Sequence, residues 1–188
     1  MIPLNNRSWT CVRLFVIASI ALLLCSCGSR DINGSAYNTL EPAFDITAFF
    51  DGEVRAWGIV QDRSGNLTQQ FTVDIDGNWD GTTLTLDETF DYGLGDGLEE
   101  RVWKLSRDEQ GQWRGSAGDI LDEATGQSFG NAFRWQYRID LPVDDTSYVV
   151  NFDDWIWAFD DNTIINRSYI TKFGITFAEV TIFMQRQS

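Results

Sequence analysis

Residues 129–141, FGNAFRWQYRIDL, carry the pattern that decides the fold. From Phe129 to Leu141 large apolar side chains recur at every second position except Asn131, and the positions between them hold small or polar residues. Successive side chains of a strand point to opposite faces, so this period predicts a β-strand with one buried face. The same period occurs in residues 67–76 and 84–92, and clusters of Gly, Asn and Asp separate such runs.

Working outward from this stretch, the pattern predicts nine strands with one apolar face each. They cover residues 53–62, 67–76, 82–92, 98–107, 112–118, 128–141, 147–159, 163–173 and 175–186. Short turns make neighbouring strands antiparallel, and no helical pattern intervenes. We therefore expect an all-β chain that closes into an antiparallel up-and-down β-barrel of about 8–10 strands. Residues 118–127 are less regular and predict a helical turn or a lid, and Asp45 is expected to cap a helical turn that ends at Phe50.

The N-terminus predicts where the protein resides. Arg7 and Arg13 precede an apolar run over residues 14–24, which is too short to span about 30 Å of hydrocarbon but suits a secretory signal. The run ends in Leu-Cys-Ser-Cys-Gly, which resembles the bacterial lipobox with Cys27 as the lipidated residue. The alternatives are Cys25 as the acylated residue, which bulky Leu24 disfavours, and an ordinary secretory signal or a short anchor.

This assignment divides the chain into three parts. Residues 1–26 are the lipoprotein signal peptide, residues 27–38 are the lipidated Cys and a tether, and residues 39–188 are the barrel domain. The expected localisation is the cell envelope, lipid-anchored at the periplasmic face of the outer membrane, because Gly28 follows the Cys as in outer-membrane lipoproteins of Gram-negative bacteria. The membrane is then a partner through the N-terminal lipid.

Composition excludes several classes of function. The chain has 14 basic and 28 acidic residues, a net charge of −14, which argues against a nucleic-acid partner and against electrostatic docking on anionic lipids. It has no histidine, which removes Ser-His and Cys-His nucleophiles and the commonest zinc ligand. We assign no catalytic residue, no metal site and no cofactor. An enzyme would have to rely on carboxylates, Lys, Tyr or a hard metal ion.

Two acidic motifs have structural interpretations that we prefer. The segment from Asp76 to Asp87 fits the spacing of a calcium loop, but its last ligand would be Asp, not Glu, and its Asn, Asp and Gly also suit a hairpin turn. Asp153 and Asp154 are adjacent on a predicted strand, so their side chains face opposite sides and do not share a site.

Charged residues on apolar strand faces are the candidate site. Glu88, Arg101 and Asp154 each fall in register with apolar neighbours, so a closed barrel would bury them. Buried charges must be paired or must hold a ligand. An interior Arg beside aromatic side chains would suit a carboxylate or phosphate, and a structural ion pair is the alternative. The ligand-binding candidates are Arg101, Glu88, Trp103, Tyr137 and Asp154.

The chain also resembles a family of uncharacterised bacterial lipoproteins of unknown function that is assigned a lipocalin-like (calycin) barrel. The resemblance covers residues 36–186 and is carried by FFDGEVRAWGIVQDR at 49–63, FDDW at 152–155 and TKFG at 171–174. This resemblance implies that the predicted barrel is lipocalin-like, and it favours a lipid as the ligand. It identifies no catalytic residue.

Three functional hypotheses remain. The first is a membrane-tethered envelope lipoprotein that binds a fatty acid, lipid or other apolar ligand in its barrel. The second is a His-independent enzyme that acts on modified acyl chains through Glu88, Asp154 or Tyr137. The third is a non-catalytic envelope scaffold with a filled barrel. Non-enzymatic binding is the hypothesis that we prefer.

The lipid anchor is directly testable. Cys27→Ser should leave an uncut precursor without lipid, because only the Cys sulfur accepts the diacylglyceryl group. The measurement is the mass of the protein and its partition into detergent, with Cys25→Ser as the matched control. Maturation of Cys27→Ser together with failure of Cys25→Ser would move the acylated residue to Cys25.

Overall fold

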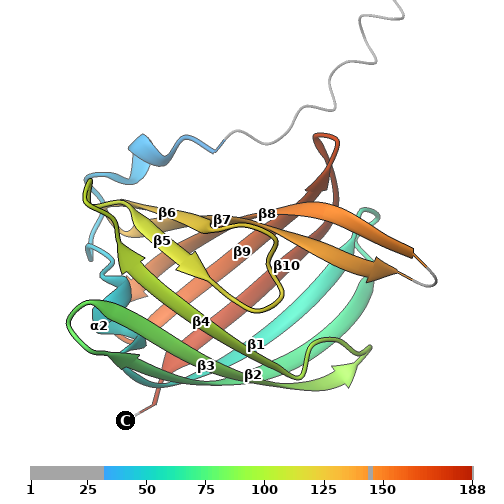
Figure 1. Ribbon diagram of the computed structural model, residues 1–188, viewed down its shortest axis with the longest axis horizontal. Coiled ribbons are helices and arrows are strands. Elements are labelled where there is room, and N and C mark those ends of the chain that lie inside the picture. The colour runs from blue at the N-terminus through green and yellow to red at the C-terminus, as the bar shows by residue number, and fades with distance from the viewer. Residues whose placement is uncertain (1–31, 144–145, 188) are drawn as a thin grey trace, which may run out of the picture. The chain divides into compact units, whose positions relative to one another are not determined.

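The computed structural model describes residues 32–143 and 146–187, which form one closed antiparallel β-barrel (Figure 1). Around the barrel the strands follow the order β1-β10-β9-β8-β7-β6-β5-β4-β3-β2. Each strand therefore pairs with its neighbours in the chain, and β1 pairs with β10 to close the sheet. This arrangement confirms the predicted all-β up-and-down barrel. Cys27 and the predicted signal peptide lie outside the described residues.

The elements include two short helical turns and ten strands. They are η1 (Gly34–Tyr37), α2 (Ile46–Phe50), β1 (Gly52–Asp62), β2 (Leu67–Trp79), β3 (Thr83–Leu94), β4 (Glu100–Arg107), β5 (Trp113–Ser116), β6 (Ala124–Phe129), β7 (Ala132–Val143), β8 (Thr146–Asp160), β9 (Thr163–Lys172) and β10 (Ile175–Arg186). No helix within this part of the chain has the length and apolar character needed to cross a bilayer.

The prediction of a single sixth strand over residues 128–141 is wrong in one respect. Residues 128–141 form the end of β6 and most of β7, joined by a tight turn at Gly130 and Asn131. Gly130 has φ of 52°, a left-handed conformation that glycine adopts at little cost. The additional strand, β6, draws most of its residues from the segment predicted as irregular.

The helical turn α2 covers one end of the barrel (Figure 1). Asp45 caps it as predicted, because its Oδ1 accepts hydrogen bonds from the amides of Thr47 and Ala48. Phe49 and Phe50 are buried in the hydrophobic core. We call this the α2 end, and the opposite end, which carries the β1–β2, β3–β4 and β9–β10 connections, the open end.

The interior is filled at the α2 end and accessible toward the open end. Near α2 the inward side chains of Val54, Ala56, Leu84 and Ile164 are at most 2% exposed. Farther along the same faces, inward residues are only partly buried: Glu88, Phe90, Tyr92, Tyr137, Leu141 and Phe152. An inward side chain stays accessible only where solvent can enter beside it. The inward faces are therefore more accessible in the open half of the barrel than in the α2 half.

Residues 32–38 of the predicted tether lie against the barrel. Residues 32–38 include η1, whose buried Gly34 leaves no room for a side chain, since a Cβ there would lie 2.7 Å from the Phe129 ring. Tyr37 contacts Trp155 on the outer face of β8, with ring centroids 5.8 Å apart. The chain therefore approaches the barrel along its outer surface.

Close packing of α2 on β2 makes Gly77 a sensitive position. A Cβ at Gly77 would lie 1.6 Å from the carbonyl oxygen of Phe50, so either α2 or β2 must move. We expect Gly77→Ala to lower the free energy of unfolding by about 1–3 kcal/mol, as overpacking does. The measurement is a urea midpoint at fixed m-value.

Gly93→Ala is the matched control. Gly93 lies on β3, and the nearest atom to its added Cβ is the Gln70 carbonyl oxygen at 3.8 Å, an ordinary contact. Its effect should stay within about 0.5 kcal/mol. Equal effects of the two substitutions would contradict tight docking of α2.

Candidate functional site

Four predicted site residues lie on inward faces of different strands in the middle of the barrel. Glu88 on β3 is directly opposite Arg101 on β4 in the strand register. Tyr137 lies on β7, and Asp154 lies on β8, opposite Ser168 of β9. The two-residue period fixes these directions, because the apolar residues flanking each of them along its strand also face inward. The structure therefore brings together residues that lie far apart in the sequence.

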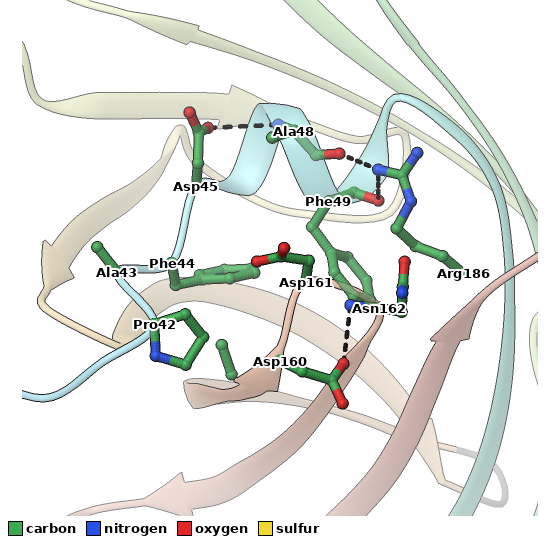
Figure 2. Close-up of a pocket in the computed structure, with 11 residues that line it drawn as sticks. Pro42, Ala43, Phe44, Asp45, Ala48, Phe49, Asp160, Asp161, Asn162 and Arg186 are labelled. Carbon is green, nitrogen blue, oxygen red and sulfur yellow. Dashed lines mark hydrogen bonds between the residues drawn. The ribbon is translucent and has the colours of Figure 1, made fainter.

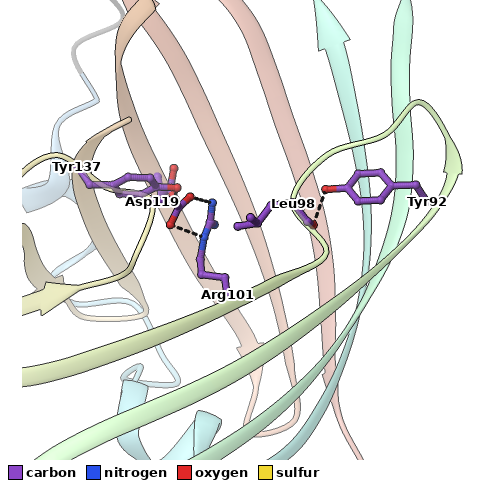
Figure 3. Close-up of polar contacts among 6 residues, drawn as sticks. Tyr92, Leu98, Arg101, Asp119 and Tyr137 are labelled. Carbon is purple, nitrogen blue, oxygen red and sulfur yellow. Dashed lines mark hydrogen bonds and ion pairs between the residues drawn. The ribbon is translucent and has the colours of Figure 1, made fainter. Parts of the chain in front are cut away.

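Arg101 is paired, but its partner is Asp119. Its Nε donates to Asp119 Oδ1 at 3.2 Å and its Nη2 donates to Oδ2 at 2.6 Å, a bidentate arrangement (Figure 3). Its guanidinium carbon also lies 5.9 Å from the Phe90 ring centroid and 5.7 Å from that of Trp103. Trp103, the fifth predicted site residue, therefore forms part of the wall around this cation.

Sequence reasoning missed Asp119. It lies between β5 and β6 in the segment predicted as a helical turn or lid, where no strand period assigns a direction to a side chain. The sequence therefore offers no signal that Asp119 faces the barrel, and the structure alone identifies it as the partner of Arg101.

The segment of residues 117–123 closes the wall of the barrel between β4 and β7. β4 pairs with β5 only over residues 104–107, and β7 pairs with β6 only over residues 132–136. Beyond these limits the segment attaches to β7 through the Ile120–Ile139 bridge and through a hydrogen bond of 2.9 Å from the Leu121 amide to the Arg138 carbonyl. Asp119 attaches it to Arg101 on the other side. The ion pair therefore belongs to the wall as well as to the site.

Asp154 is the most deeply buried carboxyl group of the site. Its residue is 8% exposed, and its Oδ2 accepts a hydrogen bond from the Tyr137 hydroxyl at 3.2 Å. Ser168 lies close enough to lower the pKa of this carboxyl group, but its hydroxyl donates to Asn166 Oδ1 at 3.0 Å. Oδ1 of Asp154 is consequently buried without a hydrogen-bond partner among the described residues.

Burial dominates the electrostatics of the site. It raises the pKa of Glu88 to about 7, with Arg101 lowering it and Asp119 and Asp154 raising it further. It raises the pKa of Asp154 to about 7 against the opposing effects of Ser168, Tyr137 and Arg101. The pKa of Tyr137 is raised by burial and by Asp154, so its phenol stays protonated. Burial lowers the pKa of Arg101, but Tyr137, Glu88 and Asp119 outweigh it and hold the guanidinium charged.

The two acidic motifs form ordinary structural contacts. Asp80 accepts hydrogen bonds from the amides of Thr82 and Thr83 in the β2–β3 turn. Asp76 and Asp87 lie opposite each other in the register of β2 and β3. Asp153 faces the opposite side from Asp154 and makes a bidentate ion pair with Arg134 at 2.6 and 2.8 Å. Within residues 32–143 and 146–187, no group of three or more His, Cys, Asp or Glu side chains is placed to hold a metal ion.

A hollow lies beside α2 at the capped end of the barrel. It has a volume of about 370 Å³, and Arg186 spans it from β10 to the carbonyl groups of Ala48 and Phe49 (Figure 2). Asp45, Asp160 and Asp161 also line it. None of the residues predicted to bind a ligand is there. The hydrogen bonds to Ala48 and Phe49 occupy Arg186 and hold the end of α2 in place.

The rim of the open end is apolar. Large hydrophobic side chains that are more than 40% exposed gather on its strand ends and connections: Leu67, Leu94, Leu98, Phe173 and Ile175. Phe173, in the β9–β10 turn, is 90% exposed and has φ of 52°. Tyr92 donates to the Leu98 carbonyl at 3.2 Å and holds the β3–β4 connection at this rim (Figure 3). The accessible half of the interior therefore opens through an apolar mouth.

A closed antiparallel up-and-down barrel of ten strands gives the described residues a lipocalin-like barrel fold. The chain is similar to the S-type phycobiliprotein lyase CPES from Guillardia theta, with 12% identity, a TM-score of 0.52, and coverage of 73% of this chain and 88% of that chain. At this identity the likeness shows the fold alone. No curated protein matches the chain. The chain belongs to the family described as "Protein of unknown function (DUF3833)", whose model matches residues 21–186.

The raised pKa values make stability depend on pH in a defined direction. Between pH values of about 4 and about 7 the folded protein holds protons on Glu88 and Asp154 that the unfolded chain has lost. The contribution of these two groups to the free energy of unfolding should therefore fall as the pH rises from about 4 to about 7. Above about pH 7 it should level off. Glu88→Gln should make this decline shallower, measured by urea unfolding from about pH 5 to about pH 8.

Asp87→Asn is the control for this measurement. Asp87 is the preceding residue on β3, and its side chain is exposed on the outer face. It should leave the pH profile as it is in the unsubstituted protein. A Glu88→Gln profile that coincides with that of Asp87→Asn would mean that Glu88 titrates normally.

Proposed function

We propose that the barrel binds a fatty acid, a lipid or another apolar molecule through its open half, and that it does so as a membrane-tethered envelope lipoprotein. The observation that carries the binding function is the contrast between the two halves of one interior. Inward residues near α2 are fully buried, whereas Phe152, Leu141 and Tyr137 remain partly accessible behind an apolar mouth. A pocket that combines apolar walls with a few convergent polar groups is typical of small-molecule sites.

The tether is the second part of the proposal and rests on the sequence. An apolar run followed by Leu-Cys-Ser-Cys-Gly supports acylation of Cys27, and Gly28 supports the periplasmic face of the outer membrane. The acidic surface does not favour anionic lipids, so the acyl chains would supply the attachment. An apolar mouth on a tethered barrel could receive ligand directly from the bilayer.

The accessible half of the barrel provides the test. Leu141 faces inward on β7 and is only partly buried, so Leu141→Asp would place a carboxylate against the bound chain. Desolvating that charge should reduce binding at least about tenfold. The measurement is the amount of lipid recovered by mass spectrometry of organic extracts from the gently purified full chain.

Val149→Asp is the matched control. Val149 lies on the adjacent strand β8, where it pairs with Asp140 on the outer face and is 45% exposed. It introduces the same charge at the same end of the barrel and should retain the bound lipid. No recoverable lipid in the unsubstituted protein would favour a filled scaffold, and recovery of a chemically altered acyl chain would favour the enzyme hypothesis.

A further inference from the structure

The interior of the barrel carries more negative than positive charge at the level of the site. Glu88, Asp119 and Asp154 contribute three carboxyl groups, and Arg101 contributes the guanidinium. Both carboxylate oxygens of Asp119 are bound to Arg101. Glu88 and Asp154 are therefore left without a cation of their own among the described residues.

Neither carboxyl group has all its acceptor sites filled: the Tyr137 hydroxyl donates to Oδ2 of Asp154, but no donor among the described residues reaches Oδ1. Asp154 is only 8% exposed, and its Oδ1 has no hydrogen-bond partner among the described residues. Glu88 has neither an ion pair within 4.0 Å nor a hydrogen bond among the described residues, although Arg101 is its partner in the strand register. Buried polar atoms in folded proteins are nearly always hydrogen-bonded, and Oδ1 of Asp154 is an exception, whereas Glu88 is only partly buried. The interior is thus short of N–H or O–H donors at this level.

Aromatic rings surround the same place. Tyr137 stacks on Phe152 with ring centroids 4.9 Å apart and meets the edge of Trp103 at 5.3 Å. Their faces carry negative partial charge, which attracts cations and disfavours anions. Carboxyl groups and π-faces therefore present the same sign of potential to a molecule in the barrel.

The obvious cations do not supply an anion site here. Arg101 already uses its Nε and Nη2 on Asp119, so an anionic ligand would have to displace that carboxylate beside two others. Lys172 lies near the open rim, with Nζ 3.7 Å from the Tyr148 ring centroid. It is four residues along β9 from Ser168, a separation of about 13 Å.

We propose that the molecule bound in the barrel is an amphiphile with a positively charged, N–H-bearing head group, such as a primary amine on a long alkyl chain, held between Glu88 and Asp154. The proposal rests on the proposed function and names the ligand class for that site. An ammonium group supplies three donors and a positive charge, which are what the two carboxyl groups lack. The raised pKa of both groups is consistent with a missing cation.

Matched fluorescent probes test the head group separately from the chain. The probes are three dansyl-labelled undecyl chains that end in a primary amine, a carboxylate or a methyl group, titrated into the full chain in phosphatidylcholine nanodiscs, with empty nanodiscs subtracted. At about pH 8 the amine should bind at least about tenfold more tightly than the carboxylate, with the neutral chain between them.

Variants then assign the preference to the two carboxyl groups. Glu88→Gln combined with Asp154→Asn should reduce the preference for the amine to about threefold or less while the neutral probe still binds. The matched control is Asp87→Asn combined with Asp140→Asn, which removes two exposed carboxylates from the outer faces of β3 and β7. The control should keep the full preference. Each variant is checked for folding by its thermal transition, and the single substitutions replace a double variant that fails to fold.

The outcomes separate the two proposals. Absence of binding by all three probes would overturn the proposed function and this inference with it. Equal binding of all three, or tighter binding of the carboxylate, would overturn the amine head group and leave apolar-ligand binding in place. A preference for the amine that survives in a folded Glu88 and Asp154 variant would also overturn it.

Discussion

Pairing of β1 with β10 is the interaction on which the rest of the structure depends. It runs from Val54 opposite Arg186 to Asp62 opposite Ala178 and leaves no free sheet edge. Closure forces every inward face into one shared interior, which must then be packed or accessible. The same strand end also supports the cap, because Arg186 binds the carbonyl groups of Ala48 and Phe49. Closing the sheet and sealing the α2 end are therefore coupled.

Closure also keeps the side chains of Glu88 and Asp154 on the inward face. A residue on a closed barrel changes face only if the register slips by one, which would turn every apolar neighbour outward. Glu88 is locked inward by Leu84 and Leu86 on its own strand, and Asp154 by Val150 and Ile156. The resulting desolvation raises the pKa of both carboxyl groups to about 7. The chemistry of the site thus follows from the same periodicity that forms the core.

The period of two in the sequence predicts most of the barrel and the inward direction of Glu88, Arg101 and Asp154. It fails where the chain turns without breaking the pattern. Phe129 and Phe133 stay in phase across Gly130 and Asn131, yet the turn places Phe129 against η1 on the outside and Phe133 in the core. It also carries no information about Asp119, whose segment is not a strand. The sequence therefore predicts that Arg101 is buried but does not identify Asp119 as its partner.

A purely structural account of the interior needs fewer charges than are present. One carboxylate suffices to neutralise Arg101, and Asp119 supplies it while also closing the wall between β4 and β7. Glu88 and Asp154 add desolvation cost without pairing with a cation, and apolar side chains of similar volume would pack in their place with equal or greater stability. A cation supplied by a bound ligand of the proposed class would offset this cost. A molecule entering through the apolar mouth, with its chain along Phe152 and Leu141 and its donors toward the two carboxyl groups, would supply this cation.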